Sequence, residues 1–187
     1  MIFPAYDTHF RDRDPLTYQR EVYDAAMQHV TNKGCAVDAG AHVGIFSSRM
    51  AKDFQEVWSF EPQPDNYACL KQNCPSVNAV NMALWDCVYL GKLITPKKRN
   101  SGAWEFMPCG NVQAVPLDYY ELDEVGLIKI DVQGSEGAVL NGAKKTIETW
   151  RPVLIVEYAN TEQLTGMGYR LVEQINKDGV FVFGENR

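Results

Sequence analysis

The chain has 187 residues, of which 45% are hydrophobic, and this is enough for a single domain with its own core. Its net charge of -6 at pH 7 argues against a broad basic surface for nucleic acid. The five cysteines include no C-x-x-C pair, so no metal site is expected. The chain begins without a basic leader, and no apolar stretch is long enough to span a bilayer, which predicts a cytoplasmic protein without a membrane partner.

The hydrophobic pattern predicts helices and strands along most of the chain. Residues 1–17 are expected to be irregular and 18–31 helical, so that 1–34 form a covering segment before a catalytic core at 35–187. Short apolar runs predict strands at 35–38, 56–60, 77–82, 87–93, 127–132, 152–158, 169–175 and 179–184. Helices are predicted at 44–53, 65–73, 117–125, 135–149 and 160–166.

The order of these elements predicts an α/β fold. Strands that alternate with helices form a mostly parallel sheet with helices on both faces. The last two strands have no helix between them, so we expect an antiparallel hairpin at the C-terminal end. Residues 86–116 are predicted to be mainly a long functional loop, because beyond one strand they contain Pro96, Gly102, Pro108 and Gly110.

The most informative sequence is a glycine-bearing turn after the first core strand. Residues 35–46 read CAVDAGAHVGIF, which places Asp38 two residues before Gly40 and adds a further glycine at Gly44. This D-x-G-x-x-x-G pattern differs from the G-x-G-x-x-G of dinucleotide-binding proteins. An acid at that place would repel a pyrophosphate but suits a cationic amino-acid group. The pattern therefore indicates S-adenosylmethionine (SAM) rather than NAD.

Other strand ends carry further candidate ligands. Glu61 lies about 20 residues beyond the glycine turn, a spacing that suits a bidentate hold on ribose hydroxyls. The sequence MALWD at 82–86 offers apolar walls and an acceptor for adenine, and Asp131 offers a carboxylate for an amino group. Because the carboxyl ends of parallel strands meet at one edge of a sheet, we expect these residues to form one site.

Five segments of the chain resemble one methyltransferase family. They read VDAGAHVGIFS (37–47), FEPQPDNYACLKQN (60–73), NMALWD (81–86), LIKIDVQGSEGAVLNGA (127–143) and RPVLIVEY (151–158). On these segments the chain is similar to the FkbM-type family of SAM-dependent methyltransferases. The resemblance implies a single-domain, Rossmann-like class I methyltransferase fold with a seven-stranded sheet. It also implies methyl transfer from SAM, usually to oxygen, so the expected acceptor is a hydroxyl on a small molecule or glycan.

The strand ends and the resemblance together give the expected site residues. The cofactor is expected to contact Asp38, Ala39, Gly40, His42, Gly44, Glu61, Pro62, Ala83, Leu84, Trp85, Asp86 and Asp131. Candidates for catalytic proton transfer are Glu136, Asp131 and His42, and Glu157 and His9 are further candidates. The segments 1–17 and 94–113 are expected to close over the methyl group of the cofactor, with Glu136 facing that space. Glu157 ends a buried strand, where an unpaired acid would be destabilising, so a functional or networked role is expected.

One departure from the family keeps alternatives open. Relatives commonly read D-V-E-G-x-E, whereas this chain has Gln133, and a neutral amide cannot act as a base. A non-catalytic protein that binds SAM or a nucleotide is therefore one alternative. An NAD-dependent oxidoreductase is another, disfavoured by the missing G-x-G-x-x-G and by the terminal hairpin. Methylation of nucleic-acid amino groups is disfavoured because residues 131–134 read DVQG rather than a D/N-P-P-Y/F turn.

Overall fold

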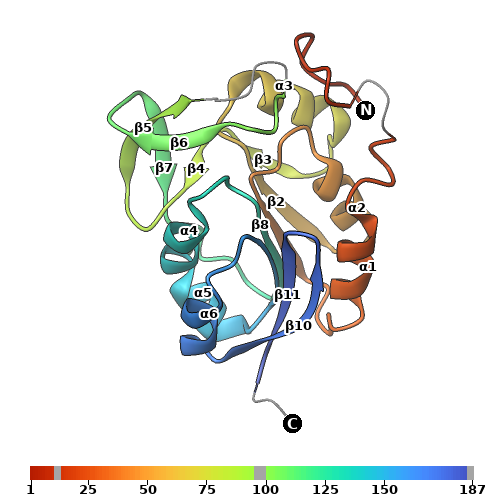
Figure 1. Ribbon diagram of the computed structural model, residues 1–187, viewed down its shortest axis with the longest axis vertical. Helices are drawn as coiled ribbons and strands as arrows, with labels where there is room; N and C mark the ends of the chain where they lie inside the picture. The colour runs from red at the N-terminus through yellow and green to blue at the C-terminus, as the bar shows by residue number, and fades with distance from the viewer. Residues whose placement is uncertain (11–13, 95–99, 185–187) are drawn as a thin grey trace.

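The computed structural model describes residues 1–10, 14–94 and 100–184, and its larger sheet has seven strands in the order β10-β11-β9-β8-β1-β2-β3 (Figure 1). The parallel strands are β1 (Cys35–Ala39), β2 (Glu56–Phe60), β3 (Asn78–Val80), β8 (Val125–Ile130) and β9 (Val153–Glu157). The hairpin of β10 (Tyr169–Ile175) and β11 (Asp178–Phe183) is antiparallel and joins the sheet through β9. The expected mostly parallel sheet with a terminal hairpin is confirmed.

Helices cover both faces of this sheet, as expected (Figure 1). On one face lie α1 (Arg20–Met27) and α2 (Ile45–Asp53). On the other lie α4 (Glu136–Gly142), α5 (Lys144–Trp150) and α6 (Thr161–Gly166), while α3 (Pro64–Asn73) packs beside β3. Successive side chains of a strand point to opposite faces, so each strand contributes to both cores.

The alternation is clearest in β1 and β8. Val37 and Ile128 pack in the core under α4 and α5, whereas Ala36 and Leu127 pack against α1 and α2. The same alternation directs Asp38 and Lys129, which are paired across β1 and β8, toward the α1 and α2 face. The fold thus places a charged pair inside an otherwise apolar layer.

Two predicted helices differ from the structure. The helix expected at 135–149 divides into α4 and α5, because the Asp118 carboxylate accepts hydrogen bonds from the backbone N–H groups of Lys145 and Thr146 and caps a new helix start. The helix expected at 117–125 is only a 3-10 turn, η1 (Leu117–Tyr120), because β8 already begins at Val125. Neither difference moves the sheet.

The prediction of a mainly irregular segment at 86–116 was wrong. The region builds a second sheet in the order β4-β7-β5-β6. Its strands are β4 (Ala83–Leu84), β5 (Tyr89–Ile94), β6 (Glu105–Pro108) and β7 (Val112–Val115). These strands are short, and they are held by long-range pairing and by contacts of the Phe106 ring with Trp85 and Tyr89. The segments 1–17 and 94–113 were expected to close over the cofactor. Parts of both, residues 11–13 and 95–99, lie outside the described residues.

Candidate functional site

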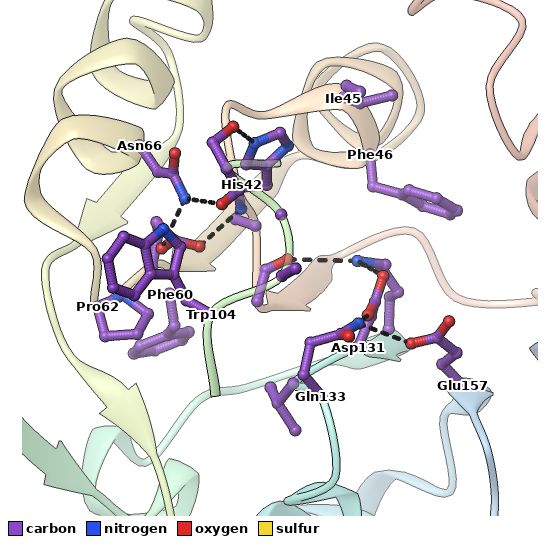
Figure 2. Close-up of a pocket in the computed structure, with 18 of the residues that line it drawn as sticks. His42, Ile45, Phe46, Phe60, Pro62, Asn66, Trp104, Asp131, Gln133 and Glu157 are labelled. Carbon is purple, nitrogen blue, oxygen red and sulfur yellow. Dashed lines mark hydrogen bonds and ion pairs between the residues drawn. The ribbon is translucent and has the colours of Figure 1, made fainter. Parts of the chain in front are cut away.

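A pocket of about 250 Å³ lies at the carboxyl ends of β1, β2, β8 and β9. This edge of an open α/β sheet is where ligands bind. Figure 2 shows two chemically different ends, with Phe60, Pro62 and Trp104 at one and Asp131, Gln133 and Glu157 at the other. Glu61 adds a carboxylate beside Pro62, whereas Lys129, Asp131, Glu157 and Lys177 gather toward the second end, so the pocket becomes more ionic along the sheet edge.

The apolar end is built by both sheets. Phe60 and Leu84 come from the ends of β2 and β4. Leu93 lies on β5, Phe106 lies on β6, and Trp104 directly precedes β6. The second sheet therefore forms the outer wall of this end. Flat aromatic walls of this kind suit a planar ring such as a purine.

The turn after β1 needs glycine because its backbone lies very close to the backbone just after β8. Gly40 has φ +78°, and a Cβ added there would lie 2.0 Å from the carbonyl oxygen of Asp131. Gly44 has φ +94°, and its added Cβ would lie 2.7 Å from Cys74 Sγ in the chain after α3. Gly40 lines the pocket, whereas Gly44 packs the turn against α3. The sequence pattern thus reflects backbone packing as well as ligand access.

Glu61 ties two turns together at the middle of the pocket. Its Oε2 accepts a hydrogen bond from the backbone N–H of His42 at 2.8 Å, and its Oε1 accepts from that of Gln63 at 2.9 Å. Burial raises the pKa of Glu61 to about 7, although both hydrogen bonds favour the charged form. Glu61 lines the pocket and still positions the start of α3.

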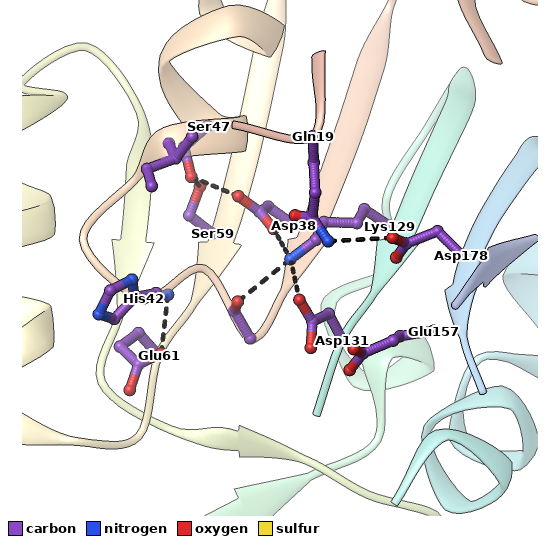
Figure 3. Close-up of polar contacts among 12 residues, drawn as sticks. Gln19, Asp38, His42, Ser47, Ser59, Glu61, Lys129, Asp131, Glu157 and Asp178 are labelled. Atoms are coloured by element: carbon purple, nitrogen blue, oxygen red, sulfur yellow. Dashed lines mark hydrogen bonds and ion pairs between the residues drawn. The ribbon is translucent and has the colours of Figure 1, made fainter. Parts of the chain in front are cut away.

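A buried lysine organises the carboxylates beneath the pocket (Figure 3). Lys129 Nζ lies 3.5 Å from Asp38 Oδ1 and 3.3 Å from Asp131 Oδ2, and it donates a hydrogen bond to the Gly40 carbonyl at 3.4 Å. The side chains of Lys129 and Asp38 are 5% and 0% exposed. Asp38 also accepts a hydrogen bond from Ser47 Oγ at 2.6 Å. Asp38 is therefore the partner of a buried cation and does not line the pocket.

The ion pairs of Lys129 outweigh the free-energy cost of burying its charge. Desolvation opposes its charge, but Asp131 and Asp38 outweigh this effect and hold the pKa of Lys129 above its usual value. Burial likewise opposes the charge of Asp131, yet Lys129 holds the pKa of that carboxyl below its usual value. Sequence reasoning did not single out Lys129, although one lysine in the apolar run LIKID was the available signal.

The polar end continues from Asp131 to Glu157. Gln133 Nε2 donates to Asp131 Oδ1 at 3.0 Å and to Glu157 Oε2 at 2.9 Å, so one amide connects the two carboxylates. Lys177 Nζ lies 3.8 Å from Glu157 Oε1. Burial, with the nearby charge of Asp131, raises the pKa of Glu157 to about 8. The networked role expected for Glu157 is what the structure shows.

The N-terminal segment and the 100–104 segment meet above His42. The Asp7 carboxylate accepts hydrogen bonds from the backbone N–H of Ser101, at 2.9 Å, and from its hydroxyl. Ser101 Oγ in turn lies 2.5 Å from His42 Nε2, and the rings of Phe3 and Phe10 lie against the same imidazole. Burial lowers the pKa of His42 to about 4, so the ring is neutral near pH 7. His42 is thus a partner of the covering segments.

The structure separates the expected site residues into two groups. Those that line the pocket are Gly40, His42, Glu61, Pro62, Ala83, Leu84 and Asp131. Those that do not are Asp38, Ala39, Gly44, Trp85, Asp86 and Glu136. The lining residues that sequence reasoning did not propose include Asn66, Lys129 and Lys177, whereas Ser101 and Trp104 lie in the segment 94–113 that was expected to cover the cofactor.

Local packing explains the residues that lie outside the lining. The Trp85 ring turns toward Tyr89 and Phe106 in the second sheet, and Asp86 is exposed. Glu136 Oε1 accepts a hydrogen bond from the backbone N–H of Gly134 at 2.9 Å, at the start of α4. Glu136 therefore does not face the pocket as expected, whereas Ser135 does.

Comparison with known proteins identifies the family. The model of the methyltransferase FkbM domain matches residues 38–175. The chain belongs to the FkbM methyltransferase family. This confirms the sequence resemblance, and S-adenosylmethionine is the cofactor of the family, as the resemblance implied. The comparison with curated proteins gave no match.

Solved structures share the fold at low identity. The FkbM methyltransferase of Methylobacillus flagellatus KT is 19% identical with a TM-score of 0.55, over 81% of this chain and 43% of that one. This chain thus spans less than half of that protein. A precorrin-6y methyltransferase of Geobacter metallireducens is 11% identical with a TM-score of 0.58, over 98% and 100% of the two chains. A 16S rRNA methyltransferase of T. thermophilus, in complex with AdoMet and guanosine, is 11% identical with a TM-score of 0.56, over 92% and 43%. The expected class I methyltransferase fold is confirmed.

None of the helices in the part of the chain that the structure describes is long and apolar enough to cross a membrane. Within those same ranges, no group of three or more His, Cys, Asp or Glu side chains could hold a metal ion.

Replacement of Lys129 by methionine tests the buried ion pairs. Lys129→Met leaves the fully buried Asp38 without its cation, so the free energy of unfolding should fall by about 3–5 kcal/mol. Urea unfolding at pH 7 measures this change. Lys144→Met is the matched control, because that ammonium is 67% exposed and its loss should change stability by less than about 0.5 kcal/mol. Equal, small losses in both variants would contradict a central role for Lys129.

Proposed function

We propose that this chain transfers a methyl group from SAM to a hydroxyl oxygen of a small molecule or sugar. The observation that carries the proposal is the graded pocket of an FkbM-family chain, apolar at one end and ionic at the other. A ligand with a purine, a ribose and a charged amino-acid group has the same gradation. When bound, SAM supplies an electrophilic methyl group on a sulfonium.

The pocket residues divide the work of holding this cofactor. Phe60, Leu84 and Trp104 would enclose the adenine, and Glu61 would accept hydrogen bonds from the ribose hydroxyls. Asp131, of which the side chain is 21% exposed, would bind the amino group. Asn66 Oδ1 lines this end and, among the described residues, is buried without a hydrogen-bond partner, which supports a polar ligand here.

A hydroxyl acceptor fits the chemistry of the ionic end. An alcohol must lose its proton as its oxygen attacks, so the site needs a base near the acceptor. Asp131 and Glu157 are carboxylates that line this end. The remaining task of the protein is alignment, which the enclosing covering segments would serve by excluding water.

The alternatives to methyl transfer onto a small hydroxyl compound differ in how well the chain supports them. The family assignment argues against the NAD-dependent oxidoreductase. A binding protein without turnover remains the second candidate, because Gln133 replaces a family carboxylate. The net charge of -6 continues to favour a small acceptor over RNA, although rRNA methyltransferases are among the fold neighbours.

Calorimetry followed by turnover tests the proposed function. We expect SAM and S-adenosylhomocysteine to bind with micromolar dissociation constants and NAD not to bind. With isotopically labelled SAM, neutral sugars and small alcohols should gain label as methyl ethers, identified by mass spectrometry and NMR, and a structured RNA should not. Binding of SAM without transfer to any acceptor would favour the binding protein.

Glu61→Gln tests the ribose contact while it keeps the shape of the side chain. Loss of a charge-assisted hydrogen bond removes about 1.5–3 kcal/mol, so the SAM dissociation constant should rise about tenfold to a hundredfold. Glu162→Gln is the control, since Glu162 is exposed on α6. An unchanged dissociation constant would show that Glu61 serves only the backbone of His42 and Gln63.

Asp7→Ala tests the closure above His42. The change removes the acceptor that holds Ser101, so the 100–104 segment should lose its position. Because Trp104 of this segment would enclose the adenine, the SAM dissociation constant should rise about tenfold, and turnover should fall about tenfold to a hundredfold. A point variant is preferable to deletion of 1–17, because Phe10 is buried against Val43 and Ile45. Asp14→Ala, at an exposed site of the same segment, is the control. Normal turnover in Asp7→Ala would contradict this role.

A further inference from the structure

The residues that line the pocket follow the order of the strands along the edge of the sheet. The apolar end lies over β2 and the second sheet, Glu61 follows β2, and Gly40 and Asp131 follow β1 and β8. If the cofactor occupies these positions as proposed, the next strand outward is β9, which ends in Glu157. The lining beyond Asp131 then consists of Gln133, Ser135, Glu157 and Lys177 with the nearby Tyr18 and Gln19.

This outer group comes from four separate segments. Gln133 and Ser135 lie in the connection between β8 and α4, and Glu157 ends β9. Lys177 lies in the turn between β10 and β11, and Tyr18 and Gln19 precede α1. Such convergence of polar side chains on one end of a pocket is typical of a binding site rather than of solvated surface.

We propose that Gln133, Ser135, Glu157 and Lys177 form the acceptor subsite, and that Glu157 is the catalytic residue that takes the proton of the acceptor hydroxyl. This inference rests on the proposed methyl transfer to oxygen. In the step, the O–H proton passes to the Glu157 carboxylate and the acceptor oxygen bonds to the methyl carbon. The bond from that carbon to the cofactor sulfur breaks, and the electron pair stays on sulfur.

Glu157 suits this role better than its neighbour Asp131. Asp131 is paired with Lys129 at 3.3 Å, which stabilises its charged form and makes it a weak base. Among the described residues, the cation paired with Glu157 is the exposed Lys177, at 3.8 Å. Burial and the charges of Asp131 and Asp178 raise its proton affinity, and Lys177 opposes them. A base of raised pKa is a stronger proton acceptor once it is ionised.

Gln133 acts as the positioning residue. Its amide donates one hydrogen to each carboxylate, so it holds Glu157 beside Asp131 without adding a third negative charge. A glutamate at the same place would put three acids in contact. The departure from the family pattern therefore fits a site in which Glu157, not residue 133, receives the proton.

The charge balance of the outer group also selects the acceptor. When Glu157 is ionised, as proton removal requires, the carboxylates of Asp131, Glu157 and Asp178 outnumber the ammonium groups of Lys129 and Lys177, which disfavours an anionic acceptor in the reactive state. Nε2 of Gln133 and Nε2 of Gln19 already donate to carboxylates, so the amide oxygens of these residues and the hydroxyl of Ser135 are the groups that would bind acceptor hydroxyls. A neutral compound with several hydroxyl groups is the acceptor class that fits.

The first test reads the carboxyl group directly in the protein without cofactor. In protein with 13C-labelled glutamate carboxyls, one resonance should titrate near pH 8 and be absent from Glu157→Gln. Gln133→Glu should move this titration to higher pH, because it adds a negative charge beside Glu157. Glu173→Gln, at an exposed position of β10, should leave the titration unchanged. Titration of Glu157 at the usual pH of a glutamate would overturn the assignment.

The second test compares binding with turnover. Glu157→Gln should bind SAM with wild-type affinity in calorimetry and lose about a hundredfold to ten-thousandfold in turnover on a neutral glycoside such as methyl glucoside. In the wild type, turnover should rise with pH toward the Glu157 titration, and this rise should be absent from Glu157→Gln. Glu173→Gln should follow the wild type.

Three outcomes separate the possible failures. If the wild type labels a glycoside and Glu157→Gln retains most of that turnover, the role of Glu157 is wrong and the proposed function stands. If only an anionic acceptor such as a glucuronate is labelled, the acceptor class is wrong. If the wild type binds SAM and labels neither, the proposed function fails and the acceptor subsite fails with it.

Discussion

The site depends on the ion pairs that the buried ammonium of Lys129 forms. A charge removed from water is tolerated only where opposite charges and hydrogen bonds compensate it. Lys129 meets this requirement with Asp38 on β1, Asp131 after β8 and the carbonyl of Gly40. These partners belong to the two central strands and to the glycine turn, so one side chain fixes the floor of the pocket.

Around this floor, the chain builds its walls from segments that lie outside the central sheet. The second sheet supplies Leu93 and Phe106 over the apolar end, and the N-terminal segment reaches Ser101 through Asp7. Both walls are held by a few directed contacts rather than by a large core. Because these elements lie outside the central sheet, their residues can differ without disturbing the sheet or the ion pairs of Lys129.

The carboxylates of the site differ in chemistry because their neighbours differ. Asp131 beside Lys129 stays ionised, whereas Glu157, with an amide and a distant exposed lysine, holds its proton more tightly. Gln133 lets the two lie together. Pairs of titratable groups whose pKa values are driven apart are typical of sites that move protons.

The sequence by itself determined the architecture and the family. Short apolar strands that alternate with helices predicted the parallel sheet, and two adjacent strands at the end predicted the hairpin. Motifs local to each strand end predicted Gly40, Glu61 and Asp131 as pocket residues. These features are readable because they depend on residues close together in the chain.

Only the tertiary structure decided how the strand ends interact. Asp38 was expected to bind the ligand, but the pairing of β1 with β8 places it beside Lys129. The pairing of β4 with β7 makes part of an expected loop into a sheet that lines the pocket. The start of α4 turned Glu136 away and left Glu157 beside Gln133. Contacts of this kind join residues far apart in the chain, so the charge that each carboxylate meets is set by the packing of the strands.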